Sequence, residues 1–369
     1  MFTVETLELT QYLNKGSKKI IKRVLSGSLL NIKEILFLSR AKRALDKSGH
    51  KRLESEKNGL HIPAFLISSI TQNCNLFCKG CYARVNSENK KCGEHPAKTL
   101  LTAEEWSVIF DEAEDLGISF NLLAGGEPLL RKDVLLVAAR KKDTIFPVFT
   151  NGTLIDKEYQ ELFDKHRNLI PIVSIEGNER ATDDRRGKGT YSRLTDAFKL
   201  LKKKRMLYGI SVTVTKENIN EVTSEEFIDS ISSYGCKIVF FIEYVPIDHA
   251  SEHIAPDENA RRLLEQSQER LQNKYNNILF LSFPGDEKYM GGCLAAGRGF
   301  FHINSDGAAE ACPFSPYSDC NVKNGGLKTA LASSLFEKIK EINLANTEHI
   351  GGCALFEKED VVKELVSDL

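Results

Sequence analysis

Residues 65–83 read FLISSITQNCNLFCKGCYA and contain the features that decide the fold. The first seven residues are mostly apolar or β-branched, and a short run of this kind predicts a buried strand. The strand leads into a loop that carries Cys74, Cys78 and Cys81. Three thiolates at this spacing can bind three irons of a [4Fe–4S] cluster, whose fourth iron stays open to another ligand. We therefore expect the functional site to begin where this strand ends.

The pattern of an apolar strand followed by an amphipathic helix continues to about residue 245. Strands are predicted at 65–71, 119–124, 146–150, 169–175, 208–215 and 237–245, and helices at 102–117, 131–142, 156–166, 191–205 and 224–234. This alternation specifies a parallel sheet covered by helices, so the fold class is α/β. Six repeats rather than eight predict an open, partial (β/α)6 barrel of the TIM type, in which functional residues lie at the carboxyl ends of the strands.

Two regions flank the predicted barrel and differ from it in composition. Residues 1–62 form a helical, basic N-terminal extension, residues 63–250 the barrel, and residues 251–369 a smaller Cys-rich domain that opens with a polar helix at 251–274 and a short strand at 278–283. Within the extension, residues 20–45 have apolar side chains at helical spacing with basic residues between them. Such a helix usually packs on the neighbouring domain, and contact with a membrane surface is the alternative.

Composition and charge exclude several classes of protein. The 369 residues carry 50 basic and 51 acidic side chains, and no basic, aromatic-interleaved tract lies outside residues 1–62, which argues against nucleic acid as a partner. Nine cysteines, an odd number, together with a first segment that does not resemble a secretory signal, favour metal ligation in a reducing compartment over disulfides. No apolar run reaches the roughly 18 residues that cross a bilayer. We expect a soluble, cytoplasmic, oxygen-sensitive protein.

Short polar motifs follow the predicted strands. The run Gly125, Gly126, Glu127 and Pro128 follows the second strand, where glycines allow the backbone to approach a ligand and a carboxylate can accept hydrogen bonds from an ammonium group. The third strand ends in Thr-Asn-Gly-Thr, which contains Asn151 and is equally typical of a turn. Ser174 and Glu176 end the fourth strand, and Arg186, which suits a carboxylate partner, lies in the segment DRRGKGTY.

Together with the cysteine spacing, these motifs resemble the radical S-adenosylmethionine (SAM) superfamily. The resemblance implies that the open iron is chelated by the amino and carboxylate groups of SAM. Reductive cleavage then gives a 5′-deoxyadenosyl radical that abstracts hydrogen from a substrate. It further implies that the Gly125–Pro128 turn binds the methionyl amino group and that Asn151, Ser174, Glu176 and Arg186 line the cofactor site. Relatives usually have Asp where this chain has Glu176, so the contact of that side chain is one methylene longer.

Four further cysteines lie in the C-terminal region, namely Cys293, Cys312, Cys320 and Cys353. Their setting, with Ala-Gly, Asp-Gly and Cys-Pro motifs, resembles the auxiliary-cluster domains called SPASM and twitch. Because only four cysteines are present here, the resemblance implies one auxiliary [4Fe–4S] cluster. Cys320 is the uncertain ligand, and a site without it would leave one iron open. Structural zinc is the alternative, because zinc also accepts four thiolates.

The resulting prediction is a radical SAM enzyme that acts on an unactivated C–H bond. The substrate is a peptide, a protein or a small metabolite, and an electron donor such as flavodoxin or ferredoxin is implied. The auxiliary cluster would accept an electron or anchor the substrate. The sequence identifies no catalytic acid or base. The rival interpretation is a non-catalytic zinc or iron–sulfur binding module.

Overall fold

The computed structural model describes residues 11, 14, 31–88, 99–246, 249–283, 292–342 and 353–368. The central element is a nine-stranded sheet in the order β7-β6-β5-β4-β3-β2-β1-β8-β9. Its strands are β1 (Phe65–Thr71), β2 (Phe120–Gly125), β3 (Phe146–Thr150), β4 (Leu169–Ser174), β5 (Gly209–Val214), β6 (Ile238–Glu243), β7 (Leu279–Phe283), β8 (His302–Ile303) and β9 (Ala309–Glu310). Strands β1 to β8 are parallel, and β9 is antiparallel to β8.

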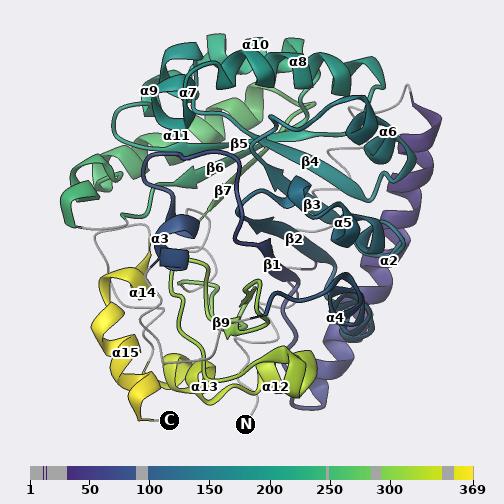
Figure 1. Cartoon of the computed structure of the whole chain (residues 1–369), viewed down its shortest axis with the longest axis vertical. Helices are drawn as coiled ribbons and strands as arrows, with labels where there is room; N and C mark the ends of the chain where they lie inside the picture. The colour runs from purple at the N-terminus through teal and green to yellow at the C-terminus, as the bar shows by residue number, and fades with distance from the viewer. Residues whose placement is uncertain are drawn as a thin grey trace.

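The helices that connect the strands cover the outside of the sheet (Figure 1). They are α4 (Ala103–Leu116), α5 (Lys132–Ala138), α6 (Lys157–Lys165), α7 (Glu179–Arg186), α8 (Thr190–Lys203), α9 (Ile219–Val222), α10 (Glu225–Ser233) and α11 (Glu258–Lys274). Helix α4 begins with a capping box at Thr102 and Glu105, because each side chain accepts from the backbone N–H of the other residue. The partial α/β barrel is confirmed, since every predicted strand of the repeat forms in parallel register.

One expectation about the barrel is wrong. The strand predicted at 278–283 was assigned to the C-terminal domain, but β7 pairs in parallel with β6, with Ile238 opposite Leu279. The physical reason is that α11 packs back on this strand, as the earlier helices do on theirs, and so forms a seventh β/α unit. On the other edge, β8 joins β1, with Ile67 opposite His302. The boundary at residue 62 stays a prediction, whereas the barrel sheet continues past residue 250 through β7.

Helix α2 (Ile32–Lys57) lies across the ends at which the strands begin (Figure 1). Its Phe37, Leu38, Ala41 and Leu45 form a second apolar core with the first residues of the strands, namely Phe120, Ile170, Leu207, Ile238 and Leu279 among others. The packing interpretation of the basic amphipathic segment is therefore confirmed for its described part. Residues 20–30 of that segment lie outside the described residues. Among the helices that are described, none is long and apolar enough to span a bilayer.

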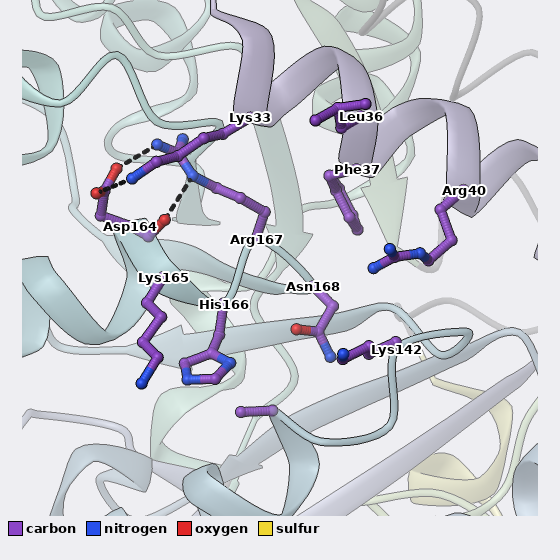
Figure 2. A pocket seen from close by; sticks show the side chains of 11 residues that line it. Lys33, Leu36, Phe37, Arg40, Lys142, Asp164, Lys165, His166, Arg167 and Asn168 are labelled. Carbon is purple, nitrogen blue, oxygen red and sulfur yellow. Dashed lines mark hydrogen bonds and ion pairs between the residues drawn. The ribbon is translucent and has the colours of Figure 1, made fainter.

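A polar network holds α2 in place. Glu34 is buried and forms an ion pair of 2.6 Å with Arg167, and Arg52 donates to Ser119 Oγ at 2.8 Å. Beside these contacts lies a hollow of about 380 Å³ between α2 and the turns that precede β3 and β4. Figure 2 shows Asp164 on its wall, joined to Lys33 and Arg167. This hollow lies at the amino ends of the strands, opposite the cysteine loop.

The C-terminal region consists mainly of short helices. They are α12 (Gly326–Leu331), α13 (Ser334–Glu341), α14 (Ala354–Glu357) and α15 (Glu359–Ser367), with a 3₁₀ turn at Val322–Asn324. Figure 1 shows these four helices on the side of the molecule where β9 lies. Another 3₁₀ turn, at His249–Ile254, precedes α11. Helix α3 (Tyr82–Glu88), which follows the cysteine loop, lies between this region and the barrel.

Candidate cofactor site at the cysteine loop

The cysteine loop is locked to the turn that follows β2. The N–H of Gly126 donates to Thr71 O at 2.7 Å, and the N–H of Glu127 donates to Asn73 O at 2.8 Å. A Cβ atom on Gly125 would overlap Thr71 O, and one on Gly126 would overlap Asn73 O. Glycine is therefore needed at both positions, because the backbone of the turn touches the backbone of the cysteine loop. The Gly-Gly-Glu-Pro motif thus lies directly against this loop.

Glu127 joins the carboxyl ends of β2 and β3. Its buried carboxylate accepts hydrogen bonds from Thr150 Oγ1 at 2.7 Å, from the N–H of Asn151 at 2.7 Å and from the N–H of Leu129 at 3.0 Å. Burial raises the pKa of Glu127, and these three hydrogen bonds oppose the rise. The carboxylate thus fixes the turn that carries the glycines. Contact with an ammonium group of a ligand stays a prediction for this residue.

Asn151 contacts the cysteine loop from β3. Its Nδ2 donates to Asn75 Oδ1 at 2.8 Å and lies 3.8 Å from Cys74 Sγ. Asn75 in turn donates to Thr153 Oγ1 at 2.9 Å. The Thr-Asn-Gly motif is therefore more than a turn, because its asparagine holds the loop at the first of the three cysteines.

Glu176 and Arg186 form a buried ion pair beside Cys78. Glu176 accepts from Arg185 Nη1 at 2.5 Å and from Arg186 Nε at 2.8 Å. Burial lowers the pKa of Arg186, but Glu176 and Cys78 outweigh it and leave that pKa raised. The longer Glu side chain therefore reaches both arginines from the end of β4. Ser174, on the same strand, lies 3.1 Å from Ser211 Oγ.

The three thiols of the loop influence one another electrostatically. Burial raises the pKa of Cys74 and of Cys78, and the charge of Cys81 raises both further, whereas Arg186 lowers that of Cys78. Within the described ranges, no three His, Cys, Asp or Glu side chains converge closely enough to bind a single ion. A cubane takes its thiolates at separate corners, and soft thiolates are its usual ligands. The donor set of the loop therefore fits a cluster.

Cys312 lies within electrostatic reach of two other C-terminal cysteines, Cys353 and Cys293. Burial raises the pKa of Cys312 well above its ordinary value, and a hydrogen bond with Cys353 and the charges of Cys353 and Cys293 raise it further. For Cys320, burial and the neighbouring Asp319 raise the pKa to about 12. Cys320 is only half-buried, and Asp319 is the charged neighbour that raises its pKa. Cys236 is buried just before β6, and a free Cys in such a place behaves as a small apolar side chain.

The two groups of cysteines are connected by aromatic packing. Tyr82, directly after Cys81, contacts Phe314 edge to face with ring centroids 4.8 Å apart. Burial raises the pKa of Tyr82, and the charges of Cys81, Cys312 and Glu310 add to it. Tyr82 therefore lies between the cysteine loop and the C-terminal thiols, a juxtaposition that no sequence motif signals.

Sequence reasoning also missed a buried chain of polar side chains on β1, β8 and β9. His302 accepts or donates at both ring nitrogens, with Ser69 Oγ 2.7 Å from Nε2 and Glu310 Oε2 2.7 Å from Nδ1. His302 and Glu310 are buried, whereas Ser69 is half-buried. Since 233 residues separate Ser69 from His302, only the pairing of β1 with β8 brings them together.

Comparison with known proteins identifies the family. The sequence pattern of the Radical SAM superfamily matches residues 68–240, which run from β1 into β6 and include the cysteine loop. The chain contains a radical SAM domain over residues 68–240. Members of this family are enzymes that use a [4Fe–4S] cluster and SAM, so the predicted cofactors are confirmed at the level of the family.

Several characterised radical SAM proteins resemble this one. The AdoMet-dependent heme synthase of Methanosarcina barkeri is 27% identical over 305 residues, which cover 76% of this chain and 85% of that protein. The PqqA peptide cyclase of Granulibacter bethesdensis is 25% identical, over 68% of this chain and 67% of that protein. The sporulation killing factor maturation protein SkfB of Bacillus subtilis is 29% identical, but the match covers only 52% of this chain and 45% of SkfB.

Solved structures agree with the fold. SuiB of Streptococcus suis bound to S-adenosylmethionine superposes with a TM-score of 0.61 at 17% identity, covering 87% of this chain and 74% of SuiB. The structure of anSMEcpe with bound AdoMet gives a TM-score of 0.58 at 15% identity, covering 83% of this chain and 97% of that one.

Proposed function

We propose that this radical SAM enzyme cleaves SAM reductively at a [4Fe–4S] cluster held by Cys74, Cys78 and Cys81, and abstracts hydrogen from an unactivated C–H bond of a peptide or protein. When bound, the cluster and SAM together supply the 5′-deoxyadenosyl radical, and the protein positions it. The observation that carries the proposal is the locked contact between the cysteine loop and the Gly125–Pro128 turn. This contact brings two family motifs, separated by over forty residues, to one edge of the sheet.

The chain's own residues supply binding and orientation. The thiols of the loop would hold the cluster, and the backbone of the Gly125–Pro128 turn would face the methionyl end of SAM. Arg186, held by Glu176 beside Cys78, is placed to attract a carboxylate. Asn151 and Ser174 would complete the wall of the site from the ends of β3 and β4.

An auxiliary cluster on Cys293, Cys312 and Cys353 is part of the proposal, because these thiols gather from three separate segments. Three protein ligands leave one iron open, which suits either electron acceptance or substrate anchoring.

Relatives support a peptide substrate, since the names of SkfB, PqqA peptide cyclase and the mycofactocin maturase MftC describe peptide or natural-product maturation. A second candidate is an iron porphyrin. It is favoured by the heme synthase, which has the widest coverage among the relatives described above, and by a Fe-coproporphyrin III synthase that is 29% identical over 42% of this chain. Incubation with Fe-coproporphyrin III, compared with short precursor-like peptides, separates the two through the mass of the product.

The first test uses anaerobically reconstituted protein with SAM and dithionite, and measures iron, sulfide, zinc and 5′-deoxyadenosine. About eight irons per chain together with SAM cleavage would support two [4Fe–4S] clusters. About four irons together with SAM cleavage would restrict the proposal to the loop cluster. Cys78→Ala should abolish cleavage, because the cube loses one of three anchors. Zinc without iron and no cleavage would instead support a binding module.

A further inference from the structure

The hydroxyl of Tyr244 is buried at the functional end of the barrel. Tyr244 follows β6 and is only 3% exposed. Its backbone N–H donates to Val214 O at 2.9 Å, which fixes the residue against β5. Among the described residues, Tyr244 Oη has no hydrogen-bond partner. A buried hydroxyl without a partner is costly, so such a group points to a ligand that the polypeptide itself does not supply.

The group that Tyr244 faces is the cysteine loop. A Cβ atom built on Gly80 would lie 2.7 Å from Tyr244 Oη, 2.9 Å from Cε2 and 3.1 Å from Cζ, so the edge of the ring occupies the place of a side chain at Gly80. Gly80 also has a φ of +66°, a conformation that favours glycine. The hydroxyl therefore rests on the backbone between Cys78 and Cys81.

The position of the Tyr244 hydroxyl indicates which atom could accept its hydrogen bond. Cys78 and Cys81 are the two proposed cluster ligands that flank Gly80, so a cluster held by them would lie near this turn, and its sulfur atoms would be acceptors for the hydroxyl. The neighbouring N–H of Lys79 is already used, because it donates to Arg185 O at 2.9 Å. An O–H donor beside a cluster sulfur makes reduction easier, since hydrogen bonds to the sulfurs stabilise the added negative charge.

We propose that Tyr244 donates a hydrogen bond to a sulfur atom of the cluster on Cys74, Cys78 and Cys81, and that it raises the reduction potential of this cluster. The inference rests on the proposed function, because it requires the cluster in the loop. It assigns to Tyr244 a positioning and tuning role toward the cofactor, which the sequence motifs do not reveal.

The test compares Tyr244→Phe with the wild-type protein after anaerobic reconstitution. Iron and sulfide are quantified, and the midpoint potential is followed by EPR without SAM. The signal that changes when SAM is added afterwards identifies the loop cluster. We expect Tyr244→Phe to hold as much iron as the wild type and to be reduced only at a more negative potential. Gly80→Ala should shift the potential in the same direction, because its methyl group displaces the hydroxyl.

Tyr208→Phe is the matched control. Tyr208 is also buried, but its hydroxyl donates to Tyr234 O at 2.9 Å, on the side of the sheet covered by α8 and α10. Its removal should leave the potential unchanged. If the reduction potential of the loop cluster is unchanged in Tyr244→Phe, the inference is overturned. If that variant also binds SAM more weakly, the hydroxyl of Tyr244 donates its hydrogen bond to SAM instead. Absence of a cluster from the wild type would overturn the proposed function itself, so the two failures are distinguishable.

Discussion

Gly125 and Gly187 both have a positive φ, of +118° and +107°, but only Gly125 has the backbone of another segment against it. The difference shows what the glycines of the candidate site do. At Gly187 the glycine serves the conformation of a turn, because nothing lies within 4 Å of a Cβ built there. At Gly125 it serves the contact between the turn after β2 and Thr71, at the start of the cysteine loop.

Alanine at these two positions should therefore have different effects. Gly187→Ala should lose about 1–3 kcal/mol of unfolding free energy, the usual cost of a sparsely populated backbone conformation, and keep its iron. Gly125→Ala adds a clash with backbone, so it should lose more stability and much of the loop cluster. Urea unfolding and iron content of both variants check this. Equal iron in the two variants would show that the glycine contact does not position the loop.

His166 gives a prediction about pH. Burial and the charges of Lys165 and Lys142 lower its pKa below the ordinary 6.5, against a hydrogen bond with the Ala139 backbone that raises it. The unfolded chain therefore binds the proton more readily, so the stability contributed by neutral His166 is present above pH 6.5 and is lost as the pH falls. His166→Gln should flatten the decline of the melting temperature between pH 7.5 and 5.5. An unchanged pH dependence would contradict this.

Among the elements, α2 shows how a basic amphipathic helix is used. Its apolar side packs under the barrel, and its polar network is anchored by the Glu34–Arg167 ion pair. Leu38 is fully buried, whereas Leu36, two residues earlier, is 65% exposed. The helix therefore closes the amino ends of the strands, and the barrel core would be exposed without it.

Truncation of these two leucines tests that role. Leu38→Ala should lower the free energy of unfolding by about 2–5 kcal/mol, because it leaves a cavity in the second apolar core. Leu36→Ala should change it by less than about 0.5 kcal/mol, as expected for an exposed position. Chemical denaturation of both variants measures the difference. Similar values for the two would mean that α2 does not stabilise the barrel.

In the whole molecule, the C-terminal region is joined to the barrel at β1. Strand β8 extends the sheet beside the strand that leads into the cysteine loop, and His302 links it to Ser69 and Glu310. Tyr82 and Phe314 pack between the two groups of thiols. The cysteine loop and the segments that carry Cys293 and Cys312 thus adjoin one continuous sheet, whereas Cys353 precedes α14.

The arrangement of the C-terminal thiols predicts unequal effects of two substitutions. Cys312→Ala should lose about four irons per chain, because Cys312 lies among the gathered thiols. Cys320→Ala should keep its iron, since Cys320 neighbours Asp319 instead. Iron and sulfide analysis after reconstitution provides the measurement. Loss of four irons from Cys320→Ala would assign that residue as a ligand.

Local patterns in the sequence determined the repeat of strands and helices, the capping box at Thr102 and the positions of the motifs at strand ends. They could do so because hydrophobic periodicity and capping depend on residues only a few positions apart. The same periodicity could not show that the strand after α11 joins the barrel, because which edge a strand pairs with is decided by packing of the whole sheet.

Only the tertiary structure decided which side chains meet. The carboxylate of Glu127 joins two strand ends, His302 meets Ser69 across β8 and β1, and Tyr244 rests on Gly80. Each of these contacts connects segments far apart in the chain, and their distances follow from strand order and register. The sequence by itself thus determined the kind of chemistry, through the cysteine spacing and its neighbouring motifs. The fold determined the surroundings of that chemistry, because burial and hydrogen bonding arise only when the sheet has formed.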